Sequence, residues 1–251
     1  MKIEFHYTYI IIAIGFILTG FFPNLLIFTS IIIIHELGHF LMAKLNKLNV
    51  EKIVIYPYGG MVKINTLVNT NINKELLVAL SGPLFQLTYY IIIYYMYQEG
   101  LIREYIYNLY KIYNYSILTF NLLPIHPLDG SKILNLVLSK ILPFNIANRL
   151  NIIISIITIS IVFLINYYSF NYTIILIVSI LIDNIIKYCK DLKYIFNKFL
   201  LERYLYKMSF KKTKEINKIN NMYKGKYHIL KENNKYITEK QALCHKFKGK
   251  I

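Results

Sequence analysis

Long apolar blocks separated by short breaker segments constrain this chain more than any other feature of its sequence. Five such blocks stand out, at residues 10–22, 25–34, 76–97, 152–168 and 172–182. Hydrophobic residues make up 56% of the 251 residues, more than a typical soluble domain contains. Apolar runs of this kind are typical of helices that cross a bilayer, where the backbone must satisfy its own hydrogen bonds. The pattern predicts an all-α polytopic membrane protein.

The breakers divide the apolar blocks into six predicted transmembrane helices. Their approximate bounds are 7–22, 25–45, 76–97, 113–142, 146–166 and 170–186, and residues 121–130 interrupt the fourth. After the second span, β-branched stretches flank Pro57-Tyr58-Gly59-Gly60 and predict a short membrane-associated β-hairpin around 56–63. We therefore expect a six-span domain over residues 1–186 and a basic tail over 187–251.

Positive charge is concentrated in that tail. The formal net charge is +16, and residues 187–251 hold 18 Lys and Arg against 5 Asp and Glu. The loops after the second and fourth spans are also basic, whereas residues 98–112 carry equal numbers of each sign. The positive-inside rule then predicts that both termini and the hairpin are cytosolic. We expect the tail to face anionic lipid rather than nucleic acid, and to be too short and polar for a large core, with an amphipathic helix near 192–219.

The segment His35-Glu36-Leu37-Gly38-His39 predicts a zinc site within the second span. Residues four apart share one helix face, so both imidazoles can bind one ion, and Glu36 can act as general base toward a water at the metal. Three ionisable residues within five positions of a membrane span are costly unless they are functional. A chance occurrence of this motif is therefore less probable here than in a soluble helix. Gly38 permits close packing of another helix.

A catalytic zinc ion needs a third protein ligand, and the chain has only three aspartates, Asp129, Asp183 and Asp191. The last two lie near the end of the sixth span and in the tail. Asp129 follows Pro124 and Pro127, and irregular backbone at membrane depth is tolerated only where it lines a buried or wet site. We therefore predict one Zn²⁺ ion bound by His35, His39 and Asp129. Glu75 and His126 are weaker candidate ligands, and Asn121 is a candidate to stabilise the oxyanion.

These elements resemble the site-2 protease family of intramembrane zinc metalloproteases. The resemblance covers about residues 1–190 and rests on three segments, namely His35–His39, Ser81-Gly82-Pro83, and Asn121–Pro124 leading into Pro127–Gly130. The six-span layout and the hairpin are most similar to the bacterial sporulation branch, which processes the precursor of the late mother-cell sigma factor. The resemblance implies a zinc endopeptidase in regulated intramembrane proteolysis, acting on a membrane-associated pro-sigma factor. It further implies inhibitory membrane partners and a place in the mother-cell membrane that surrounds the forespore.

The sequence also departs from that family, and it leaves alternatives open. Gln86 stands where an Asn is frequent, Ser131 replaces a common Gly, and the tail has no recognisable CBS or PDZ domain. Gln86, Gly59 and Gly60 join Asn121 as candidates for contact with substrate or oxyanion. One alternative is the same chemistry on another membrane-bound regulator. Another is a non-proteolytic metal-binding scaffold or transporter, which would have no use for the base Glu36.

Overall fold

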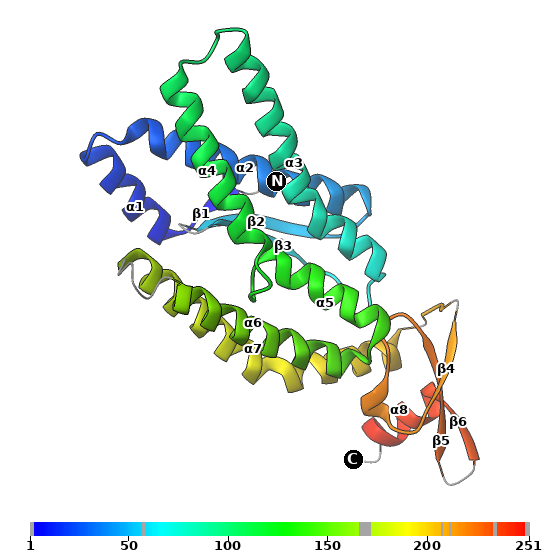
Figure 1. Cartoon of the computed structure of the whole chain (residues 1–251). Helices are drawn as coiled ribbons and strands as arrows, with labels where there is room; N and C mark the ends of the chain where they lie inside the picture. The colour runs from blue at the N-terminus through cyan, green and yellow to red at the C-terminus, as the bar shows by residue number, and fades with distance from the viewer. Residues whose placement is uncertain are drawn as a thin grey trace. The chain divides into compact units, whose positions relative to one another are not determined.

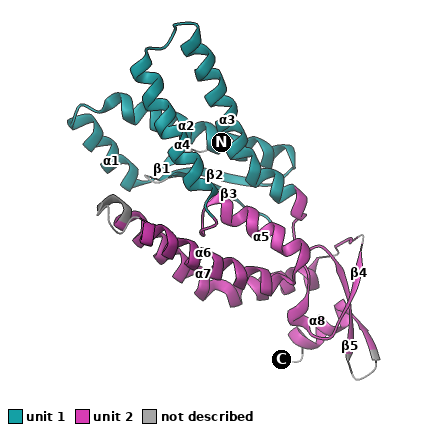
Figure 2. Ribbon diagram, in the orientation of Figure 1, with its two compact units in different colours: residues 1–66, 74–123 teal, residues 67–73, 124–251 magenta. Residues whose placement is uncertain are grey.

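A computed structural model of the chain describes residues 3–56, 59–165, 172–206, 208–210, 212–232 and 235–248 (Figure 1). The chain divides into two compact units, coloured separately in Figure 2. The first comprises residues 1–66 and 74–123, and the second comprises residues 67–73 and 124–251.

The first unit combines helices with a three-stranded sheet. In chain order its elements are β1 (Ile3–Phe5), α1 (Tyr7–Leu18), α2 (Phe22–Leu45), β2 (Val50–Tyr56), β3 (Gly59–Ile64), α3 (Ile72–Gln98) and α4 (Glu104–Leu122). β2 pairs antiparallel with β3, with Tyr56 opposite Gly59, and β1 pairs parallel with β2. The predicted hairpin is confirmed, although Pro57 and Tyr58 of its turn lie outside the described residues.

Helix α2 is held by several neighbours within this unit. Pro23 suits its first turn, where a backbone N–H has no helical partner to lose. Ile31 and Ile32 on α2 are buried in one cluster with Tyr9 of α1 and Tyr110 of α4. The same cluster includes Ile55 of β2, so α2 packs on both helices and sheet. This packing fixes the rotation of α2 and hence the direction of its polar side chains.

The second unit carries the remaining helices and a second sheet. Its elements are α5 (Asp129–Ile141), α6 (Phe144–Ile165), α7 (Tyr172–Leu205), β4 (Thr213–Ile216), the 3₁₀ turn η1 (Ile219–Asn221), β5 (Tyr227–Glu232), β6 (Lys235–Thr238) and α8 (Glu239–Lys248). β4 pairs parallel with β5, which pairs antiparallel with β6. The expected interruption of the fourth span is observed, because residues 123–128 separate helices α4 and α5.

The C-terminal residues, which we expected to be too short and polar for a large core, contribute to a small core that they share with helix α6. Helix α7 continues through the expected boundary at residue 186, and strand β4 replaces the end of the helix predicted near 192–219. A buried apolar cluster joins α6 and α7 to the sheet and α8, and it includes Phe144, Phe199, Leu200, Ile216, Met222, Leu230 and Leu243. Each short element contributes only one or two of these side chains. No long apolar run therefore marks this core in the sequence.

A buried ionic cluster stabilises the same region. Arg203 of α7 donates from its guanidinium to Glu239 Oε1 at 2.9 Å and to the Tyr223 carbonyl at 2.7 Å. His228 donates from Nδ1 to Glu239 Oε2 at 3.1 Å and accepts from the Tyr223 N–H at Nε2. Burial lowers the pKa of His228, although Glu239 opposes the shift, so the imidazole is neutral. Each charge in this cluster is thus paired and hydrogen-bonded, as burial of charge requires.

Residues 67–73, which connect β3 to α3 along the chain, are bound to α7. The backbone N–H groups of Val68 and Asn69 donate to the Glu202 carboxylate at 2.9 and 3.0 Å. The Asn69 side chain accepts from Arg203 Nε at 2.8 Å. A sequence-distant helix therefore holds the segment that leads out of the hairpin.

Three helices among the described residues are long and apolar enough to cross a membrane, namely α2, α3 and α6. Helix α1 is apolar but has only 12 residues. Large apolar side chains lie exposed on these helices, for example Leu18, Ile92 and Leu164. Water would not favour such surfaces, whereas lipid does. The structure supports a membrane protein, and the count of six spans stays a prediction.

Reporter fusions test that topology. Two fusion points are expected to be cytosolic, one at the C-terminus and one within residues 65–71, because both lie near basic segments. A reporter that works only in the cytosol should therefore be active at both points. A reporter inserted at Gly100, between α3 and α4, is expected to be active only in the exported compartment. Export of the C-terminal fusion would overturn the predicted orientation.

Candidate metal centre

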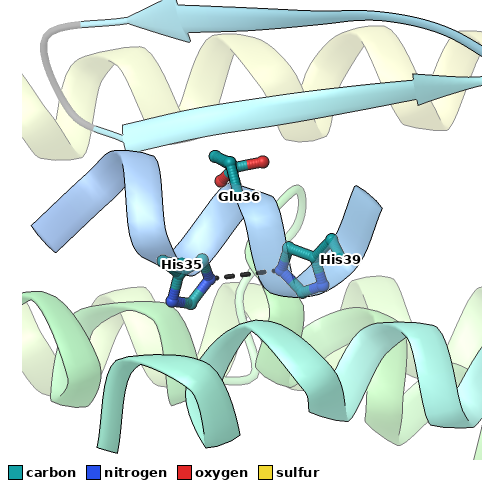
Figure 3. Close-up of side chains that lie close together, drawn as sticks. All are labelled: His35, Glu36 and His39. Atoms are coloured by element: carbon teal, nitrogen blue, oxygen red, sulfur yellow. Dashed lines mark hydrogen bonds between the residues drawn. The ribbon is translucent and has the colours of Figure 1, made fainter. Parts of the chain in front are cut away.

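One face of α2 brings two imidazoles together. His35 and His39 are one helical turn apart, and their Nε2 atoms lie 3.2 Å from each other (Figure 3). Together with Glu36 they form a buried group whose ligand-type atoms all lie within 4.8 Å of one another. Figure 3 shows the histidines directed to one side of α2 and Glu36 to the other, toward the strands of the hairpin.

The opposite nitrogen of each imidazole is already engaged. His39 Nδ1 donates to the carbonyl oxygen of Val78 at 2.7 Å, and His35 Nδ1 donates to Gln86 Oε1 at 2.9 Å. A carbonyl or amide oxygen can only accept, so each Nδ1 carries the proton. Both Nε2 lone pairs therefore face the same point in space. Two converging lone pairs suit a cation, which is how histidine binds zinc.

Gly82 of α3 keeps that point open. A Cβ atom at Gly82 would lie 2.8 Å from His35 Nε2 and closer still to His39 Nε2. The missing side chain thus leaves room beside both nitrogens. Gly38 of α2 has the matching role, since a Cβ there would lie 2.6 Å from the Ser81 carbonyl oxygen. The residues present therefore fit a zinc ion in donor type and in space.

Glu36 lies against the hairpin. Its side chain is 4% exposed, and the backbone of β3 passes directly over it. A Cβ atom at Gly60 would lie 2.7 Å from Glu36 Oε1 and closer to two carbons of the same side chain. Gly60 therefore contacts the predicted base, whereas the sequence suggested only a turn or a substrate contact.

The other predicted residues lie as follows. Asp129 is the first residue of α5 in the second unit, is buried, and accepts from Lys132 Nζ at 2.9 Å. Asn121 lies in the last turn of α4, and Glu75 in the first turn of α3. Asp183 is exposed and paired with Lys187, as expected for a residue near the surface.

His126 and Ser131 also lie in the second unit. The His126 ring stacks on Tyr188 at 4.1 Å between centroids, and its backbone N–H donates to Ser155. Ser131 is buried and exchanges hydrogen bonds with Asn151 of α6. Ser131, which departs from the family pattern, is thus accommodated by a polar partner on α6.

The sequence did not identify the carbonyl of Val78 as the partner of His39, or Asn114 as the partner of Gln86. The carbonyl of Val78 carries no sequence signal, because every residue has one. Asn114 of α4 is fully buried and accepts from Gln86 Nε2 through both its backbone and side-chain oxygens. The sequence carries a weak indication of Asn114, because it is an amide residue in an apolar helix and lies seven positions, or two helical turns, before Asn121.

Several known proteins are similar to this chain in sequence. A sequence profile of peptidase family M50 matches residues 23–104, which include all of α2 except its first residue, the hairpin and the whole of α3. Stage IV sporulation protein FB of Bacillus subtilis is 38% identical over 153 residues, which are 61% of this chain and 53% of that protein. A zinc metalloprotease of Methanocaldococcus jannaschii is 31% identical over 153 residues, 56% of this chain and 43% of that protein. The chain thus spans about half the length of these relatives.

The fold is shared as well. The solved site-2 protease from Methanocaldococcus jannaschii superposes with a TM-score of 0.58 at 25% identity, over 74% of this chain and 89% of that one. The resemblance noted from the sequence motifs is therefore confirmed. Residues 23–104 thus match peptidase family M50, and the surrounding fold is similar to that of a site-2 protease.

Proposed function

We propose that this protein is an intramembrane zinc metalloprotease that hydrolyses a peptide bond in a membrane-associated precursor. The observation that carries the proposal is the convergence of two histidine lone pairs beside Gly82, one helical step from the buried carboxylate of Glu36. A pure metal scaffold or transporter has no use for a carboxylate held in that place. The similarity to named zinc metalloproteases supports the same conclusion.

His35, His39 and Asp129 are the residues that we propose would hold one zinc ion. Three protein ligands are typical of catalytic zinc, and the histidine pair supplies two. Asp129 is the proposed third ligand because it is a buried carboxylate at the start of a helix that follows an irregular segment. Asp183, by contrast, is exposed and paired with Lys187.

Zinc, when bound, supplies a Lewis acid that polarises a peptide carbonyl and makes water easier to deprotonate. Glu36 takes one proton from the water as its oxygen bonds to the carbonyl carbon, and it delivers a proton to the amine as the C–N bond breaks. The hairpin covers Glu36 and limits its access to bulk water. Asn121 is proposed to donate a hydrogen bond to the developing oxyanion.

A helical substrate must unwind before its peptide bond can react, and the unwound backbone then needs new hydrogen-bond partners. β3 offers them. Within the described residues the sheet order is β1-β2-β3, so β3 pairs with a strand on one side only. We propose that an extended substrate segment adds to this edge beside Glu36.

The proposed substrate is a pro-sigma factor in sporulation, cleaved in the mother-cell membrane around the forespore. Its support is the similarity to a protein named for stage IV of sporulation, together with the sporulation-type layout of hairpin and spans. Another membrane-bound regulator is the alternative. Coexpression with a tagged candidate pro-sigma factor separates the two.

Glu36→Gln is expected to lower cleavage of the tagged precursor by at least about 100-fold, because loss of a general base costs about 10²–10⁴-fold. Membrane insertion and zinc content should stay at the wild-type level, because the proposed ligands are intact. Cleavage and zinc are measured on the same purified sample. Near-normal cleavage would remove Glu36 from the mechanism.

Asp129→Ala is expected to lose both zinc and activity, as are His35→Ala and His39→Ala. Asp183→Ala is the matched control, since it removes an exposed aspartate and should change neither. Zinc per polypeptide is measured by elemental analysis after purification. Full zinc content in the Asp129 variant would exclude this residue as the third ligand.

Gly60→Ala is expected to lower cleavage without loss of zinc, because the three atoms nearest to the added methyl all belong to Glu36. Gly15→Ala is the control, since a Cβ at Gly15 meets nothing within 4 Å. Equal activity of both variants would contradict the close contact between β3 and the base.

Disulfide crosslinks report on the same strand edge. Cysteines are placed singly at 61, 62 and 63 and paired with cysteines along the cleavage region of the precursor, after replacement of Cys189 and Cys244. Strand addition predicts crosslinks that advance in register and alternate between faces. Crosslinks to the helices alone would leave the hairpin as a cover for the site.

A further inference from the structure

A chain of buried amides connects His35 to helix α4. His35 Nδ1 donates to Gln86 Oε1 at 2.9 Å, and Gln86 Nε2 donates to the backbone oxygen of Asn114 at 2.9 Å and to its side-chain oxygen at 3.1 Å. Gln86 and Asn114 are both 0% exposed. One side chain of α3 therefore joins α2 to α4 through atoms that water does not reach.

Asn114 determines which way the hydrogen bonds between His35, Gln86 and Asn114 run. The backbone oxygen of Asn114 can only accept, so the NH₂ group of Gln86 must face α4 and its oxygen must face His35. That oxygen likewise only accepts, so Nδ1 of His35 carries the proton. The Nε2 lone pair of His35 is thereby directed at the open space beside Gly82.

The two histidines differ in what holds them. His39 is bound to the main-chain carbonyl of Val78, which survives any substitution at that position. His35 depends instead on a side chain, that of Gln86. Hydrogen-bond partners of metal-binding histidines fix the ring orientation, and their loss costs about 10–100-fold in metal affinity.

We propose that Gln86 and Asn114 are positioning residues that set the zinc affinity of the site by fixing the tautomer and orientation of His35. Gln86 acts on the metal site and not on the substrate, whereas its place in the sequence suggested a substrate contact. The inference rests on the proposed zinc site. Gln86 orients His35, and Asn114 orients Gln86.

Gln86→Met tests the proposal in the full chain in detergent. Methionine has a similar length and shape but cannot accept the Nδ1 proton. Competition with a fluorescent zinc chelator is expected to show zinc affinity about 10–100-fold weaker than in the wild type. At saturating zinc, KM for the precursor should stay unchanged.

Two further variants separate hydrogen bonding from packing. Gln86→Glu keeps an acceptor for His35, and its carboxyl, when protonated, can still donate to Asn114, so zinc affinity should stay well above that of the Met variant. Tyr110→Phe removes a buried polar atom from the same helix as Asn114 without touching Gln86, and should bind zinc as the wild type does. Equal loss in the Glu and Met variants would overturn the assignment.

The tautomer of His35 can be measured directly by NMR, without bound zinc. Nitrogen chemical shifts of the zinc-free wild-type chain, labelled at histidine, should show His35 with its proton on Nδ1. The Gln86→Met variant should shift this population toward Nε2, while His39 stays unchanged. An unchanged His35 tautomer, or a raised KM with normal zinc affinity, would refute the positioning role. Failure of the wild type to bind zinc would instead refute the proposed function.

Discussion

The close approach of α2 and α3 underlies the metal centre. A Cβ atom at Gly38 would collide with the Ser81 carbonyl oxygen and the Phe85 side chain, and one at Gly82 would collide with both imidazoles. Small residues at such crossings let helix backbones approach in a membrane, where apolar side chains alone give little driving force. The same absence of volume at Gly82 leaves the space that both Nε2 atoms face. Helix packing and metal binding thus depend on one set of glycines.

Val78, Gly82 and Gln86 follow one another at intervals of four residues, so they form one stripe along α3. Each contributes differently to the facing helix. A carbonyl holds His39, an absent side chain leaves space, and an amide holds His35. Because all three residues lie on one face of the same helix, their contacts reach α2 at successive turns. The geometry of the histidine pair is therefore set by a neighbouring helix as much as by the helix that carries it.

The two sides of α2 serve separate purposes. The histidines face α3, and Glu36 faces the hairpin, where Gly60 allows the strand to rest on the carboxylate. In the second unit, α7 holds residues 67–73 through Glu202 and Arg203, and these residues follow β3 in the chain. The C-terminal region thus contributes to the anchoring of the segment between the hairpin and α3. The apolar cluster and the Arg203–Glu239 ion pair stabilise the C-terminal region, which keeps Glu202 and Arg203 in place.

Local patterns in the sequence determined the helical membrane character, the hairpin, the pairing of His35 with His39, and the placement of Glu36 beside them. These features depend on residues only a few positions apart, so periodicity and turn chemistry reveal them. Tertiary structure alone decided the partners of the histidines, the contact of Gly60 with Glu36 and the core of the C-terminal region. Gln86 lies 51 residues from His35 and 28 from Asn114, and a buried hydrogen bond over that separation leaves no periodic trace. The C-terminal core was not predicted either, because its apolar side chains come one or two at a time from short elements that only folding brings together.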